Sequence, residues 1–208
     1  EQWLREFEEE NQITFSEEQF RGICQAVRSP FFILTGGPGT GKTTTLKGVL
    51  HLLDHLGDTV VLAAPTGRAA RRMAELTGRE AQTLHRLLEI KPGISWACYQ
   101  PQQIIRADCV VIDEFSMVDT WIAGALMRAA APHTRFLFIG DQDQLPSIGP
   151  GNILRELLSC PQIPAIRLNR IYRQADNSDI AFNAQRVIQG HMPDLHNGRQ
   201  FHVRVFTD

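Results

Sequence analysis

The sequence predicts an α/β fold in which helices cover both faces of a parallel sheet. Short, continuous apolar runs alternate with helical segments, and such runs are typical of strands buried on both faces. The chain has 208 residues, 43% of them hydrophobic, and a net charge of −2, which favours a folded domain over disorder. No stretch is long and apolar enough to span a membrane, and the glutamate-rich first ten residues do not resemble a secretory signal.

The strands are predicted from apolar runs that end at turn-forming residues. The first run is stopped by Gly36-Gly-Pro, the third by Asp113-Glu114 and the fourth by Gly140. In order, the predicted strands span residues 31–34, 58–64, 109–112, 135–139 and 165–168.

The helices are predicted from helical spacing and from start signals. Ser16 and Gln19 can form a capping box at the start of an amphipathic helix, and Pro65-Thr-Gly is typical of another helix start. Further helices are predicted at residues 41–56, 65–75, 81–90, 120–131, 152–158 and 178–189. Residues 91–106 contain two prolines, one glycine and two aromatics, and this composition predicts a loop or hairpin excursion.

A glycine-rich loop between the first strand and the next helix matches a phosphate-binding motif. The segment Gly36-Gly-Pro-Gly-Thr-Gly41-Lys42-Thr43 fits G-x-x-x-x-G-K-[ST] in the required strand–loop–helix context. The glycines allow backbone N–H groups to surround a phosphate, and the helix N-terminus adds partial positive charge. Lys42 can then reach the β- and γ-phosphates, while the Thr43 hydroxyl can bind Mg²⁺.

Two acids follow the third predicted strand. Asp113 is suited to Mg²⁺ coordination, and Glu114 to orienting or deprotonating an attacking water. The alternative for the pair is an acidic turn that caps a helix.

Polar residues also follow the fourth strand. Gln144 can hydrogen-bond a γ-phosphate, or it can belong to a polar turn. Farther along, Arg173 can supply a cation to the transition state of phosphoryl transfer, and Arg170 is the competing candidate; either can instead be a surface arginine.

A second group of residues is suited to backbone contacts with nucleic acid. Hydroxyls, helix N-termini and arginines bind phosphates without reading sequence. The candidates, which follow the second strand or lie near residue 85, are Pro65, Thr66, Arg68, His85 and Arg86. His85 can equally be structural, and a solvated helix face is favoured for Arg71 and Arg72.

Three further side chains have two open interpretations. Gln19 can contact an adenine through its amide, a role compatible with the capping box. Trp96 and Tyr99 can stack on bases or wedge a duplex, or they can fill a local apolar patch. The four cysteines lack C-x-x-C spacing, which predicts free thiols in a reducing cytoplasm.

Together these segments resemble superfamily 1 DNA helicases, in particular the RecD-like branch that includes the exodeoxyribonuclease V alpha subunit. The resemblance rests on the glycine-rich loop and on Ala64-Pro-Thr-Gly-Arg, Thr83-Leu-His-Arg, Val111-Ile-Asp-Glu, Gly140-Asp-Gln-Asp-Gln-Leu-Pro and Ile171-Tyr-Arg-Gln, which occur in the family's order. It implies a P-loop NTPase domain of the RecA-like type that uses ATP and Mg²⁺ to move along single-stranded DNA and to separate strands.

The resemblance implies roles for matching residues. Catalysis would involve Lys42, Glu114, Gln144 and Arg173, and Mg²⁺ would be held by Thr43 and Asp113. The expected nucleotide-binding residues are Gln19, Gly37, Pro38, Gly39, Thr40, Gly41, Lys42, Thr43 and Thr44.

The resemblance also implies a domain layout. We expect an acidic N-terminal extension at residues 1–13, a motor domain at 14–175 with the insertion at 91–106, and at 176–208 the start of a connection toward a second motor domain. Because the chain starts at Glu1 instead of a methionine, we expect it to be a fragment of a longer cytoplasmic parent, active in DNA repair or recombination. The alternatives are a nucleotide- and DNA-binding regulatory module, the helicase part of a conjugative relaxase, and a small-molecule P-loop kinase, for which no arginine-rich lid is evident.

Overall fold

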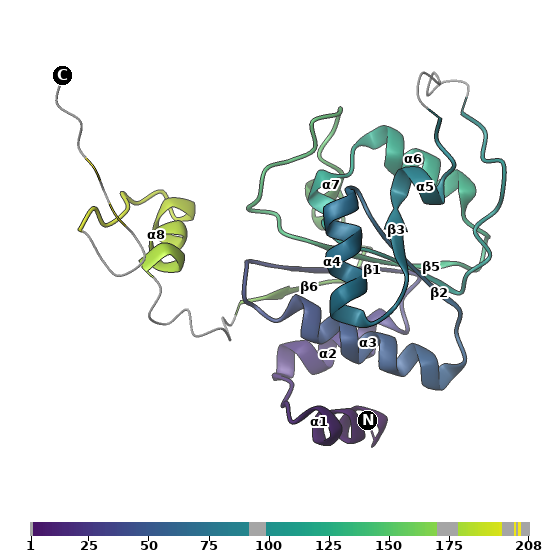
Figure 1. Ribbon diagram of the computed structural model, residues 1–208, viewed down its shortest axis with the longest axis horizontal. Helices are drawn as coiled ribbons and strands as arrows, with labels where there is room; N and C mark the ends of the chain where they lie inside the picture. The colour runs from purple at the N-terminus through teal and green to yellow at the C-terminus, as the bar shows by residue number, and fades with distance from the viewer. Residues whose placement is uncertain (1, 92–98, 170–178, 197–201, 203, 205–208) are drawn as a thin grey trace.

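The computed structural model describes residues 2–91, 99–169, 179–196, 202 and 204. Within these ranges, helices lie on both sides of a single parallel sheet (Figure 1), which confirms the predicted α/β class. No described helix is both long enough and apolar enough to cross a bilayer.

The sheet has the strand order β3-β2-β4-β5-β1-β6, and all of its described pairs are parallel. The strands are β1 (Phe31–Gly36), β2 (Val60–Ala64), β3 (Ala81–Thr83), β4 (Cys109–Ile112), β5 (Arg135–Gly140) and β6 (Ala165–Leu168). Because β2, β4, β5 and β1 are successive neighbours, their carboxyl ends lie side by side at one edge. Open α/β sheets bind ligands at this edge.

Alternate residues of the strands build a separate core on each face. Leu34 and Val111 pack in a cluster with residues of α1 (Gln2–Asn11), α2 (Glu17–Ala26) and α3 (Lys42–Leu56). Ile33 and Val110 belong to the opposite cluster, with residues of α6 (Thr120–Ala129) and α7 (Ile153–Leu158). Figure 1 shows α1, α2 and α3 below the sheet and α6 and α7 above it. The remaining helices are α4 (Gly67–Thr77), α5 (Leu84–Leu87), the short 3-10 helix η2 (Phe115–Met117) and α8 (Asp179–Ile188).

The acidic N-terminal segment forms α1, a helix that the sequence analysis did not predict. Its Leu4 is fully buried and its Phe7 nearly so, and both pack in the core cluster on the α3 side. A ring nitrogen of His51 on α3 hydrogen-bonds the Trp3 carbonyl at 3.0 Å, and the Trp3 and His55 rings stack at 5.0 Å. The glutamates of α1 therefore belong to the outer side of a docked helix.

The single helix predicted at residues 81–90 is wrong. Residues Ala81–Thr83 form β3, an edge strand paired with β2, and the helix is only the four residues of α5. Thr83 ends the strand and caps α5, because its hydroxyl accepts the Arg86 N–H at 3.2 Å. Pairing with β2 satisfies the backbone of a segment too short to be recognised as a strand.

The other predicted elements are present with small shifts at their ends. β2 begins at Val60 instead of residue 58, and α4 begins at Gly67, where Thr66 is the N-cap, and runs on to Thr77. Part of the predicted excursion, including Trp96, lies outside the described residues. Tyr99 is buried and donates its hydroxyl to the Leu88 carbonyl at 2.7 Å, so for this ring the interpretation as part of an apolar patch is confirmed.

Candidate nucleotide and nucleic-acid sites

The glycine-rich loop lies between the end of β1 and the first residue of α3. Gly41 is the N-cap of α3 at φ 87°, a left-handed conformation that glycine adopts at little cost, and it supplies no side-chain cap. The free N–H groups of the first turn therefore point out of the helix toward the loop, as anion binding requires. Thr40 closes the loop through a 2.8 Å hydrogen bond from its hydroxyl to the Gly37 carbonyl.

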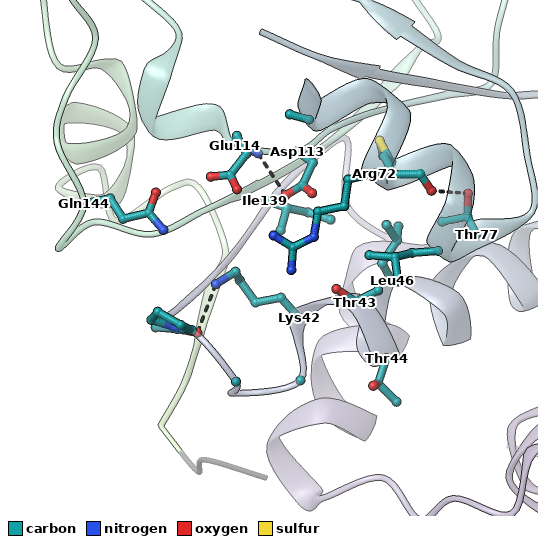
Figure 2. A pocket seen from close by; sticks show the side chains of 17 residues that line it. Lys42, Thr43, Thr44, Leu46, Arg72, Thr77, Asp113, Glu114, Ile139 and Gln144 are labelled. Carbon is teal, nitrogen blue, oxygen red and sulfur yellow. Dashed lines mark hydrogen bonds between the residues drawn. The ribbon is translucent and has the colours of Figure 1, made fainter. Parts of the chain in front are cut away.

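A cavity of about 260 Å³ opens above this loop. Figure 2 shows Lys42, Asp113, Glu114 and Gln144 directed toward it from the loop and from the ends of β4 and β5. The lining consists of loop residues, strand-end residues and one side of α4: Gly37, Pro38, Gly39, Gly41, Lys42, Thr43, Thr44, Leu46, Ala69, Arg72, Met73, Leu76, Thr77, Asp113, Glu114, Ile139 and Gln144. Side chains up to about 100 residues apart in sequence thus share one cavity.

Lys42 is held by the loop itself. Its ammonium donates to the carbonyl of Gly36 and, at 3.1 Å, to the carbonyl of Gly37. Burial lowers the pKa of Lys42, while the nearby carboxylates of Asp141 and Asp113 act in the opposite direction. The ammonium is thus a partly desolvated cation whose present acceptors are neutral carbonyls.

The two acids after β4 form a half-buried pair. The Asp113 carboxylate accepts the Glu114 N–H at 2.9 Å, and Glu114 has a left-handed backbone at φ 52°, which is costly for a residue with a side chain. Burial raises the pKa of Asp113; for Glu114, burial and then the charge of Asp113 raise the pKa. A base with a raised pKa is better matched to proton transfer near neutral pH.

The loop after β5 combines a polar turn with a side chain aimed at the cavity. The Asp141 carboxylate accepts the Asp143 N–H at 3.0 Å, and the Gln144 N–H donates to the Asp141 carbonyl at 3.2 Å. The turn leaves the Gln144 amide directed into the cavity (Figure 2). The polar turn is therefore present, and the position of Gln144 at the cavity leaves its predicted γ-phosphate contact as a prediction.

Gln19 forms the predicted capping box, but it does not line the cavity. Its side-chain oxygen accepts the Ser16 N–H at 2.9 Å, and its own N–H donates to the Ser16 hydroxyl at 3.2 Å. Its amide nitrogen lies 3.5 Å from the Gly41 carbonyl, so α2 is connected to the end of the glycine-rich loop.

A second, smaller hollow of about 200 Å³ contains three of the residues predicted to contact nucleic acid. Pro65, Thr66 and His85 line it together with apolar side chains such as Met117 and Ile148. Arg68 is exposed and lines neither hollow, whereas Arg86 lines a separate hollow beside Arg106. The structure therefore brings together three of the five candidates and separates the two arginines from them.

Arg72 lines the nucleotide-side cavity, which the sequence analysis did not foresee. Arg71 and Arg72 are both exposed, as expected for a solvated helix face, and Arg71 pairs with Glu75 at 3.0 Å. Arg72 in addition directs its guanidinium toward the cavity beside Asp113 (Figure 2). The candidates Arg170 and Arg173 lie outside the described residues.

Comparison with known proteins agrees with this geometry. A family described as an AAA domain matches residues 14–204. The chain is 41% identical over 179 residues to the ATP-dependent RecD2 DNA helicase of Deinococcus radiodurans, covering 86% of this chain and 24% of that protein. It is 36% identical over 159 residues to the RecBCD enzyme subunit RecD of Haemophilus influenzae, covering 65% of this chain and 25% of that protein.

A solved structure supports the fold. Bacteroides Pif1 bound to single-stranded DNA superimposes with a TM-score of 0.64 at 22% identity, over 86% of this chain and 47% of the other. The chain spans about a quarter of the length of the two sequence relatives.

Proposed function

Because this chain belongs to the AAA-domain family, in its RecD-like helicase branch, we propose that it is the first motor domain of an ATP-dependent DNA helicase. The observation that supports this most directly is the convergence of Lys42, Asp113, Glu114 and Gln144 on one cavity beside the glycine-rich loop. ATP would be the nucleotide, and its hydrolysis would drive movement of the parent protein along single-stranded DNA.

We assign one role in hydrolysis to each of three cavity residues and one to Arg173, which lies outside the described residues. Lys42 exchanges its loop carbonyls for the β- and γ-phosphate oxygens of ATP. Glu114 orients a water and accepts its proton as the water oxygen bonds to the γ-phosphorus, while the bond from that phosphorus to the β–γ bridging oxygen breaks. Gln144 hydrogen-bonds the γ-phosphate, and Arg173 stabilises the charge that develops.

The donor set fits Mg²⁺. The described residues hold no cluster of three or more His, Cys, Asp or Glu side chains able to cage a metal. Mg²⁺ bound with a nucleotide needs only one or two protein oxygens, because phosphates and waters complete its shell. The Thr43 hydroxyl and the Asp113 carboxylate line the same cavity and would hold it. The ion would neutralise charge on the phosphates.

The second hollow is our candidate for the DNA backbone. Thr66 and His85 offer polar contacts, and the N-terminus of α4 offers partial positive charge. A second motor domain of the parent would close over the nucleotide, as expected for a site that lies open at one edge of the sheet.

Steady-state ATP hydrolysis by the full-length parent, with and without single-stranded DNA, tests the proposal. Lys42→Ala and Glu114→Gln should each lower DNA-stimulated kcat by at least about 100-fold, the lower bound expected for removal of a charge-stabilising cation and of a positioned base, respectively. Arg71→Ala, a change at an exposed arginine, is the control and should keep wild-type turnover. Undiminished turnover in either site variant would refute the mechanism, and ATP-independent DNA binding alone would favour a regulatory module.

A further inference from the structure

Arg72 is exposed and directs its guanidinium toward the cavity beside the glycine-rich loop (Figure 2). In the part of the chain that the structure describes, no carboxylate lies within ion-pairing distance of its guanidinium and no acceptor takes a hydrogen bond from it. Neighbouring Arg71, by contrast, has Glu75 as its partner at the surface. Arg72 is exposed to solvent, so a ligand in the cavity can replace the water around its guanidinium with phosphate oxygens that accept its N–H groups.

The charges around Arg72 identify the kind of ligand. Its guanidinium stabilises the ionised forms of Asp113 and Glu114 and disfavours the charged form of Lys42, so it shares their electrostatic environment. Two cations, Lys42 and Arg72, thus flank one space. Arginine is always charged and binds phosphate oxygens through two parallel N–H donors.

We propose that Arg72 binds the terminal phosphate of the nucleotide and that α4 thereby connects the nucleotide cavity to the second hollow. The proposal rests on the function proposed above and adds a residue to it. The terminal phosphate is the target because Arg72 lies beside Asp113 and Glu114, which mark the hydrolytic end of the site.

The same helix contributes to both hollows. Thr66 caps α4, accepting the Ala69 N–H at 3.2 Å, and lines the second hollow. Arg72 follows six residues later, about 9 Å along the helix axis at 1.5 Å per residue. Met73, in the next position, is buried in the core, which holds the helix as a rigid element. A phosphate held by Arg72 and a strand held near Thr66 therefore bias the position of one helix, and each should alter the affinity for the other.

Equilibrium binding to the full-length parent tests the first part of the proposal. The probes are a non-hydrolysable ATP analogue and ADP, both with Mg²⁺, and the variants are Arg72→Ala, Arg72→Lys, Arg71→Ala and Lys42→Ala. Arg72→Ala should weaken the ATP analogue about 10- to 100-fold, the loss expected for a charge-assisted hydrogen bond, and ADP less than about threefold. The affinity of Arg72→Lys for the ATP analogue should lie between those of the wild type and Arg72→Ala. Arg71→Ala should bind both nucleotides as the wild type does.

Binding of a fluorescent single-stranded oligonucleotide with and without the ATP analogue tests the second part. The factor by which the analogue changes DNA affinity in the wild type should fall toward one in Arg72→Ala and persist in Arg71→Ala. An unchanged factor would overturn the connection through α4.

Two outcomes overturn the phosphate contact. The first is that Arg72→Ala binds both nucleotides with the affinity of Arg71→Ala. The second is that Arg72→Ala loses affinity for the ATP analogue and for ADP equally, which would make Arg72 a general structural residue. Failure of the proposed function is distinct: the wild type would then bind neither nucleotide, and Lys42→Ala would not differ from it.

Discussion

Leu4→Ala tests whether α1 belongs to the folded domain. Leu4 is fully buried in the cluster between α1, α2 and α3, although it lies before residue 14, where the family match begins. Replacing a fully buried leucine by alanine removes about 2–5 kcal/mol of stability, because apolar burial is lost and a cavity remains. For a chain of this size that corresponds to a fall in Tm of about 4–20 °C, at roughly 2–4 °C per kcal/mol.

Urea unfolding of the 208-residue chain, followed by circular dichroism, measures this loss. The matched control is Leu56→Ala, the same substitution at a residue of α3 that is 54% exposed. This control should change the free energy of unfolding by less than about 0.5 kcal/mol. If Leu4→Ala cost no more than Leu56→Ala, α1 would be a dispensable attachment. The domain would then begin near residue 14, as the sequence predicts.

The other predictions concern the site and its supports. As the pH is lowered, kcat/KM for ATP should fall with a midpoint above the usual pKa of a glutamate. The reason is that hydrolysis needs the carboxylate form of Glu114, whose pKa is raised. As the pH is raised, kcat/KM should fall with a midpoint below the usual pKa of a lysine, because the ammonium form of Lys42 is needed and burial lowers its pKa. A pH–rate profile measures both limbs. Arg173→Ala should slow single-turnover hydrolysis by about 10³-fold or more while ATP affinity stays within about threefold, and equal losses would contradict a transition-state role. Affinity for single-stranded homopolymers should show no base preference and fall steeply with salt, by about 0.7 log units per log unit of salt for each phosphate contacted; a flat titration would count against a phosphate-binding groove. Gly140→Ala should destabilise the chain by about 1–3 kcal/mol, because a Cβ there would stand 2.8 Å from a Leu154 methyl and 3.2 Å from the Ser116 nitrogen. Urea unfolding measures the loss. The control is Gly124→Ala, whose Cβ would meet only the Arg128 side chain, at 3.4 Å.

The sheet and its loops were predictable because their signals are local. Each central strand is a continuous apolar run, and each run ends at residues that cannot continue it, such as Gly36 and Asp113-Glu114. Parallel strand order then requires those ends to meet at one edge. The cavity shared by Lys42, Asp113 and Gln144 follows from that requirement.

The missed features depend on partners that are distant in sequence. β3 is three residues long and only half-buried, so its hydrogen bonds to β2 decide its conformation. α1 presents few apolar residues among many acids, and its docking depends on α3. Arg71 and Arg72 are adjacent on one helix and both exposed, and a rotation of about 100° between them directs Arg71 toward Glu75 and Arg72 toward the cavity.

The way the glycine-rich loop binds Lys42 has a consequence for the proposed phosphate contact. The ammonium of Lys42 donates to the carbonyls of Gly36 and Gly37, which belong to the loop itself. Under the proposed function, these carbonyls would compete with a phosphate for the same N–H donors, and the charge of Lys42 would have acceptors with either partner.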